Sequence, residues 1–166
     1  MAAAVVVALG ALAAMIGLVV HIRAGENGTG RLGFASTSAA AAPFTEFSEA
    51  RVSLGERCLR VLVAASPAQR VQGLRDVTSL GPYAGMLFVT RTDVQDHFTM
   101  AQTPMPLAIT FFSSSGAPVD TAQMVPCPHG SDASCPEYVS KSRYRYALER
   151  PAGSAPASGT LGGCSA

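Results

Sequence analysis

The stretch Cys58-Leu-Arg-Val-Leu-Val-Ala-Ala-Ser-Pro-Ala-Gln69 contains the clearest structural signal in this chain of 166 residues. Its first part, residues 58–65, is rich in valine and leucine and predicts a buried strand. Ser66 can cap a helix, the proline after it suits the first helical position, and Gln69 can complete a capping box. We therefore expect a short helix directly after this strand, and Gly73 can end it.

Several shorter strand candidates follow this helix. They are residues 85–89, 97–100, 107–112, 119–124 and 143–149, with room for one more short strand near Leu161. Ser113-Ser-Ser-Gly116 is a turn sequence, so the strands on either side of it are expected to form a hairpin. Many short strands with one short helix favour a mainly β fold, a compact β-sandwich or jelly-roll-like barrel, over any βαβ arrangement.

The N-terminal segment Ala2–Val20 has no charged side chain. A helix over this segment would be about 28 Å long, close to the roughly 30 Å thickness of the hydrocarbon layer of a bilayer. A basic region before the apolar run, typical of cleaved signal peptides, is missing, and a buried core helix would need a polar face. We therefore favour an uncleaved transmembrane helix, and a cleaved signal peptide stays the main alternative.

Composition divides the rest of the chain. Residues 24–43 are rich in glycine, alanine, serine and threonine, which predicts a flexible linker between an anchor or signal segment over 1–23 and a β-rich domain over 44–166. Lysine and arginine number 12 and aspartate and glutamate 11, giving a net charge of +1. Because no basic face or run is present, we expect no nucleic-acid partner.

An ordered series of motifs between residues 58 and 164 resembles the family called domain of unknown function 192. The resemblance implies a compact β-rich, jelly-roll-like fold, and no activity is established for that family as such. The matching stretches are Ala64-Ala-Ser-Pro67 with Arg70 and Gly73-Leu74, then Gly85-Met-Leu-Phe88, Phe98-Thr-Met-Ala-Gln-Thr-Pro-Met-Pro-Leu107, Pro126-Cys127, Cys135, Tyr138, Tyr146-Ala-Leu-Glu149 and Ala152-Gly153.

Departures from the family pattern concern its central motif. Thr99 stands where the family has an aromatic residue, Ala101 replaces a lysine, Gln102 an asparagine, and Ala108 an aspartate. If these polar positions bind something, this chain has lost the charged part of that site. On the strength of the resemblance we take five residues of these motifs as candidate ligand contacts: Phe98, Met100, Gln102, Thr103 and Tyr138.

The cysteines suggest an oxidising environment. Cys127 and Cys135 lie in a loop rich in proline, glycine and serine, and a disulfide between them would stabilise the domain by roughly 2.5 kcal/mol. A metal site that adds His129 would still need a fourth ligand, and two unlinked thiols are the other alternative. Cys58 and Cys164 form a possible second pair.

The sequence contains opposing signals for the side of the membrane on which the domain lies. His21, Arg23 and Arg31 follow the apolar segment, and the positive-inside rule alone would place the domain in the cytoplasm. The cysteine pair and the family resemblance favour the outside instead. We therefore predict a single-pass protein of the cytoplasmic membrane with its domain on the extracytoplasmic side.

Five methionine and histidine side chains could in principle bind a metal ion, but they are better explained by packing. Met86, His97, Met100, Met105 and Met124 include soft ligands for Cu(I), but methionines more often fill a core between strands. We therefore expect neither a metal nor a cofactor.

Catalytic signals are weak. Asp93 and Asp96 beside His97 can in principle carry out acid–base chemistry, although a solvated turn explains them as well. Tyr138, Tyr144 and Tyr146 can stack on a sugar ring or pack within the domain. The chain has no nucleophile elbow, zinc-protease motif, phosphate loop or dinucleotide fingerprint, so we predict no catalytic residues.

The function favoured by the sequence is a non-catalytic binding module for a small ligand, a glycan or an envelope protein. The alternative is a hydrolase whose site is assembled from loops. A cavity that holds Asp96, His97 and a converging hydroxyl group would favour the enzyme. A shallow groove of tyrosine and methionine would favour binding.

Overall fold

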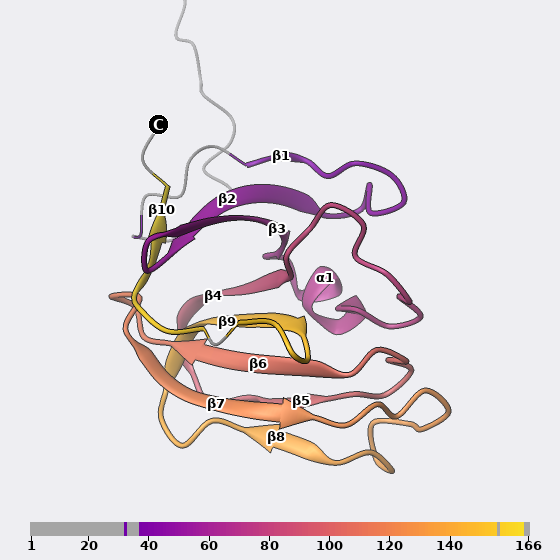
Figure 1. Cartoon of the computed structure of the whole chain (residues 1–166). Coiled ribbons are helices and arrows are strands. Elements are labelled where there is room, and N and C mark those ends of the chain that lie inside the picture. The colour runs from indigo at the N-terminus through magenta and orange to yellow at the C-terminus, as the bar shows by residue number, and fades with distance from the viewer. Residues whose placement is uncertain (1–31, 33–36, 156, 165–166) are drawn as a thin grey trace, which may run out of the picture.

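The computed structural model describes residues 32, 37–155 and 157–164, and the described residues form ten strands and one helix (Figure 1). The segment predicted to cross the membrane lies outside them, as does most of the predicted linker. Within the described ranges, no helix is both long enough and apolar enough to cross a bilayer.

Eight of the strands form one sheet. Seven of them follow the order β1-β2-β3-β4-β9-β6-β7, and the eighth, β10, pairs with β2. The remaining two, β5 and β8, pair with each other in a separate small sheet. The elements are β1 (Ser38–Ala39), β2 (Ser48–Leu54), β3 (Arg57–Ala64), α1 (Pro67–Gln72), β4 (Met86–Val94), β5 (His97–Thr99), β6 (Leu107–Phe112), β7 (Pro118–Met124), β8 (Glu137–Val139), β9 (Tyr144–Pro151) and β10 (Leu161–Gly163).

The predicted strand and helix around residue 66 are confirmed. Ser66 Oγ accepts a hydrogen bond from the Gln69 backbone N–H at 3.2 Å, and Gln69 Oε1 accepts one from the Ser66 N–H at 3.0 Å. This reciprocal pair satisfies two of the free N–H groups at the start of α1, and Gly73 ends the helix. The fold near this helix is therefore determined by local sequence.

The exclusion of any βαβ arrangement is wrong for one pair of strands. β3 and β4 are parallel, and the connection between them contains α1. A parallel neighbour requires a long crossover, here residues 65–85, rather than a tight turn. The other pairings in the large sheet are antiparallel, including the predicted hairpin of β6 and β7.

Both faces of the large sheet are buried. We call one the closed face; its core consists of Ala50, Val52, Leu54, Leu59, Val61, Val63, Leu87, Val89, Phe112, Tyr146, Leu148 and Leu161. We call the other the covered face, because α1, the loop after it and the small sheet of β5 and β8 lie over it (Figure 1). Adjacent residues of β4 such as Met86 and Leu87 alternate between the two cores, as the two-residue period of a strand requires.

The closed face is formed by curling of the sheet. The Leu161 N–H of β10 donates a hydrogen bond to Gly116 O, in the turn between β6 and β7, at 2.8 Å. A Cβ atom on Gly116 would lie 2.0 Å from Leu161 O, so only glycine permits this approach. A disulfide between Cys58 and Cys164 joins β3 to the end of β10 at the same side.

The predicted mainly β fold with one short helix is confirmed, but the large sheet is open rather than a closed barrel or a pair of packed sheets. Ser38–Ala39 also pair with β2 inside the stretch predicted to be linker, and Ala40 is buried. Apart from this, the predicted strands after α1 all appear, with β4 extending several residues further than expected.

Tyr83 fastens the loop after α1 to the sheet. Its hydroxyl donates to Glu49 Oε2 at 2.6 Å and accepts from the Ala41 N–H at 2.8 Å. Arg60 binds the same carboxylate through two hydrogen bonds and stacks on the Tyr83 ring. These contacts hold one part of the cover against β2 and β3.

Candidate functional site

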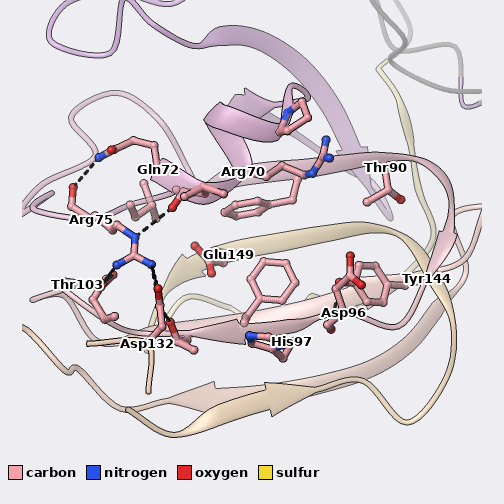
Figure 2. Close-up of a pocket in the computed structure, with 18 residues that line it drawn as sticks. Arg70, Gln72, Arg75, Thr90, Asp96, His97, Thr103, Asp132, Tyr144 and Glu149 are labelled. Carbon is pink, nitrogen blue, oxygen red and sulfur yellow. Dashed lines mark hydrogen bonds and ion pairs between the residues drawn. The ribbon is translucent and has the colours of Figure 1, made fainter. Parts of the chain in front are cut away.

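A cavity of about 350 Å³ opens on the covered face (Figure 2). α1 and the loop after it form one wall, β5 and the loop of the Cys127–Cys135 disulfide form the other, and β4 and β9 form the floor. Its polar lining residues are Arg70, Gln72, Arg75, Thr90, Asp96, His97, Thr99, Thr103, Asp132, Tyr144 and Glu149. The volume lies within the range of small-molecule sites.

Arg75 holds the two walls together at one end of the cavity. Its guanidinium donates two hydrogen bonds to the Asp132 carboxylate, at 2.7 and 2.9 Å. It also donates to Gln102 Oε1 at 3.0 Å and to two backbone carbonyl oxygens. Asp132 in turn accepts a hydrogen bond from Thr99 Oγ1 at 2.6 Å. The hydrogen bonds from Thr99 and Arg75 lower the pKa of Asp132, so its carboxyl stays ionised at neutral pH.

The loop that contains Asp132 is closed by the predicted disulfide between Cys127 and Cys135. Gly130 lies against this bond, because a Cβ atom there would be 2.3 Å from both sulfur atoms. The disulfide removes both thiolates from the alternative metal site with His129. In the described part of the chain, no cluster of three histidine, cysteine or acidic side chains is arranged for a metal ion. The second pair, Cys58 and Cys164, is bonded as well.

The other end of the cavity contains Tyr144, Asp96 and Arg70. The Tyr144 hydroxyl donates to the backbone oxygen of Asp96 at 3.3 Å. Burial raises the pKa of Tyr144, and the negative charge of Asp96 raises it further while Arg70 opposes the rise. Arg70 donates from one guanidinium nitrogen to Ala65 O and Val89 O, which fixes α1 to β4.

Glu149 lies between these two ends in Figure 2. It belongs to β9, opposite Met86 of β4 and Ile109 of β6, and is 4% exposed. Its carboxyl group has no hydrogen-bond or ion-pair partner in the described part of the chain. Burial alone raises the pKa of Glu149 to about 8. An acid of this kind is uncommon in a core and often marks a functional site.

Gly85 permits the close packing of β4 and β9 at Glu149. A Cβ atom on Gly85 would lie 2.2 Å from Glu149 O and 2.8 Å from the Arg150 side chain. The backbone of the crossover can therefore approach β9 only with glycine at this position. This contact places Glu149 at the floor of the cavity.

Two of the five predicted ligand contacts line the cavity, Phe98 and Thr103. Met100 is fully buried in the covered-face core and does not line it. Gln102 is exposed outside the cavity, where its side chain accepts from Arg75. Tyr138 pairs with Phe98 across the small sheet, and its hydroxyl accepts from a backbone N–H at 2.9 Å, so it supports the wall from behind.

Methionine packing explains the possible copper ligands, since Met86, Met100 and Met124 are buried in one core. Tyr144 and Tyr146 do not form a shared stacking surface. A register shift between β4 and β9 separates them, so Tyr144 lies on the covered face and Tyr146 on the closed face. Both are buried, whereas residues two positions apart on a regular strand share one face.

Sequence reasoning missed Arg75, Asp132 and Glu149 as lining residues, and it named Tyr144 only as a possible stacking residue. A usable signal existed for Glu149: an acid in the apolar run Tyr146-Ala-Leu-Glu149, within a motif of the family resemblance. For Arg75 and Asp132 no local signal exists, because they are 57 residues apart and meet only through the fold.

The cavity does hold Asp96 and His97 with three threonine hydroxyls. The hydroxyl of Thr90 donates to the backbone oxygens of Thr92 and Arg145. Thr99 Oγ1 donates to Asp132, and Thr103 Oγ1 to a backbone oxygen at 3.3 Å. His97 has no hydrogen bond in the described residues. An activated nucleophile requires a base within hydrogen-bond reach. The carboxylate that Thr99 reaches, Asp132, is bound by Arg75 and has a lowered pKa, which makes it a weak base.

The family model of DUF192, described as "Uncharacterized ACR", matches residues 50–164. The chain belongs to the DUF192 family. The match covers the open sheet from β2 to β10, α1 and every residue that lines the cavity. A comparison with curated proteins finds no match.

Two solved structures have a similar fold. A protein of unknown function from Novosphingobium aromaticivorans superposes with a TM-score of 0.60 at 21% identity, over 72% of this chain and 83% of its own. A protein from Sinorhizobium meliloti, described as a candidate transcription regulator, gives a TM-score of 0.57 at 29% identity, over 64% of this chain and 83% of its own. At 21% identity, the similarity to the Novosphingobium protein supports the fold of the DUF192 domain and nothing more specific.

Proposed function

We propose that this DUF192 protein is a non-catalytic binding module whose cavity takes one small ligand. The observation that carries the proposal is Glu149, a buried carboxyl group on the floor of a cavity of about 350 Å³ that has no partner among the described residues. A buried polar group without a partner costs about 1–3 kcal/mol, and a bound ligand that satisfies it recovers this free energy.

A hydrolase is the second candidate, because Asp96, His97 and Glu149 share the cavity. Binding is favoured over hydrolysis since the hydroxyl groups are engaged elsewhere and His97 has no hydrogen-bonded partner among the described residues. A panel of nitrophenyl esters and glycosides tests this candidate. Turnover that disappears in His97→Ala would establish the enzyme and refute the binding module.

We further propose that the domain is held at the outer side of the cytoplasmic membrane. The support is the uncharged segment Ala2–Val20 together with the two disulfides, which persist in oxidising compartments. The description of the Sinorhizobium protein is not transferred to this chain, because a net charge of +1 provides little attraction to nucleic acid.

Thermal shift of the full chain in detergent tests ligand binding. The compounds are amines, amino acids, sugars, nucleotides and divalent metal ions, and a true ligand raises the melting temperature in proportion to ln(1 + [L]/Kd). Phe98→Ala should remove the shift, whereas Val139→Ala, paired near it in the same small sheet but outside the cavity, should keep it. If no compound shifts the melting temperature, the small-ligand function is refuted and an envelope protein becomes the partner to seek.

Orientation is tested in intact cells with a membrane-impermeant reductant and a membrane-impermeant maleimide. An outward domain should be labelled at Cys127 and Cys135 without lysis. Labelling that requires lysis would place the domain in the cytoplasm.

A further inference from the structure

We infer that the ligand of this cavity is an organic ammonium ion whose charge is neutralised by Glu149. This inference rests on the proposed function, in that the cavity binds a small molecule. It adds the chemical class of that molecule and the side chain that selects it.

The charges of the cavity balance except at Glu149. Arg75 is paired with Asp132 at 2.7 Å at one end. At the other end, Arg70 and Asp96 act with opposite signs on Tyr144, so the cation and the anion lie close to the same hydroxyl. Neither arginine influences the carboxyl group of Glu149, whose pKa responds to burial only. When Glu149 is ionised, a ligand that balances its charge brings a positive charge to the floor of the cavity.

Aromatic rings line the cavity beside this carboxyl group. Phe88, Phe98 and Tyr144 are lining residues, with the Phe88 and Phe98 rings 5.1 Å apart, edge to face, and the Phe98 and Tyr144 rings 6.2 Å apart. The face of an aromatic ring attracts a cation, and several rings with one carboxylate form the usual environment of a bound ammonium group.

An anionic ligand would find few free donors. Arg75 already donates to Asp132, Gln102 and two carbonyl oxygens, and Arg70 uses one guanidinium nitrogen on two carbonyl oxygens. Asp96 and Asp132 add negative charge at both ends. An anion would therefore compete with two aspartates for the remaining N–H groups of Arg70.

Ammonium binding at this site releases a proton. With a pKa of about 8, Glu149 is about nine-tenths protonated at pH 7, and a bound cation favours the carboxylate. The other charged and titratable groups that line the cavity are Arg70 of α1, Arg75 of the following loop, Asp96 and His97 at the start of β5, Asp132 of the disulfide loop and Tyr144 of β9. At pH 7 the neutral form of Glu149 exceeds the ionised form about tenfold. One ion pair in a desolvated site can overcome a preference of this size.

Three probes of nearly the same shape test the inference: benzylamine, benzyl alcohol and benzoate. Binding to the full chain in detergent is measured by calorimetry at pH 7 in two buffers with different ionisation enthalpies. We expect benzylamine to bind at least about tenfold tighter than benzyl alcohol, with benzoate weakest and with release of nearly one proton per benzylamine bound. Glu149→Gln should abolish both the preference and the proton release.

The matched control is Glu56→Gln, which makes the same chemical change at an exposed turn residue between β2 and β3. It should keep the preference for benzylamine. The ammonium assignment is overturned if benzyl alcohol or benzoate binds the wild-type chain as tightly as benzylamine, or if none of the three binds. The broader panel of compounds decides the proposed function separately, since a sugar or nucleotide that binds would preserve it while the ammonium assignment fails.

Discussion

The two faces of the large sheet bury similar sets of apolar residues by different means. The closed face is covered by the sheet itself, which curls until β10 contacts the turn between β6 and β7. The covered face is closed by separate parts: α1, the loop after it, and the small sheet of β5 and β8. The cavity that contains Glu149 lies under this second cover, whereas a second cavity of about 480 Å³ lies beside Leu148 and Arg150.

This difference shows where a small β domain can place a binding site. A curled sheet brings its own side chains into contact, and apolar residues fill the space to the density of an organic crystal. A cover built from short elements cannot match the sheet surface at every point. The gap between α1 and β5 is such a mismatch, and polar residues from distant segments line it.

Removing the disulfides should give the largest difference in stability between the two faces. Cys58–Cys164 closes a sequence separation of 106 residues and Cys127–Cys135 one of 8. On the chain-entropy estimate, replacing each pair by serines should cost about 4.8 kcal/mol for the closed face and about 2.5 kcal/mol for the covered face. Urea unfolding followed by tyrosine circular dichroism measures both values. Equal costs would show that the two faces do not differ in this respect.

Aromatic truncation on each face should have a somewhat smaller effect. Phe112 is fully buried on the closed face, and Phe112→Ala should cost about 3–5 kcal/mol. Phe98 is partly exposed to the cavity, so Phe98→Ala should cost clearly less while enlarging the site. The same unfolding assay compares them. A larger loss for Phe98→Ala would mean that the cover, rather than the curled sheet, holds the domain together.

Glu149, which lies on the covered face, should make the stability of the domain depend on pH. Its pKa is about 8 in the folded state and 4.5 as the reference, so the folded state binds more protons between these values. Stability should therefore fall by a few kcal/mol as pH rises from about 4.5 to 8, and level off above that. Glu149→Gln should remove this fall and stabilise the chain at pH 9. Unfolding curves at several pH values decide it; a fall of the same size in the variant would refute the assignment to Glu149.

Ser66→Ala should have the smallest effect. It removes the acceptor at the start of α1, and losing such a cap costs about 1 kcal/mol. Because α1 is part of the cover, we expect faster hydrogen exchange in α1 and weaker ligand binding, with the closed face unchanged. Exchange that accelerates equally in β3 and β6 would show that the helix and the sheet unfold together.

Much of the secondary structure could be predicted because its causes are local. The capping residues around Ser66, the hairpin turn before Gly116 and the apolar runs of β3 and β6 depend on neighbours within a few positions. The parallel pairing of β3 with β4 could not be predicted in this way. It depends on which strands meet across a crossover of about twenty residues, and alternation alone does not reveal the direction of a strand.

The candidate site was predicted less well than the fold. Phe98 and Thr103 were found through the family resemblance, whereas Met100 and Tyr138 belong to the same motifs but point elsewhere. Position in a motif therefore identified the segment but not the orientation of each side chain. That orientation depends on the twist of β5 and on the phenylalanine rings that pack behind it.

What the sequence by itself determined is the family, the mainly β class, the short capped helix and the cysteines available for pairing. These features depend on residue type and short-range order, which the sequence states directly. Only the tertiary structure decided that Cys58 reaches Cys164, that the sheet stays open, and that Glu149 lies in a cavity with no partner in residues 32, 37–155 and 157–164. The physical reason is that the burial of a side chain and its interaction partners depend on residues that the fold brings together from distant parts of the chain.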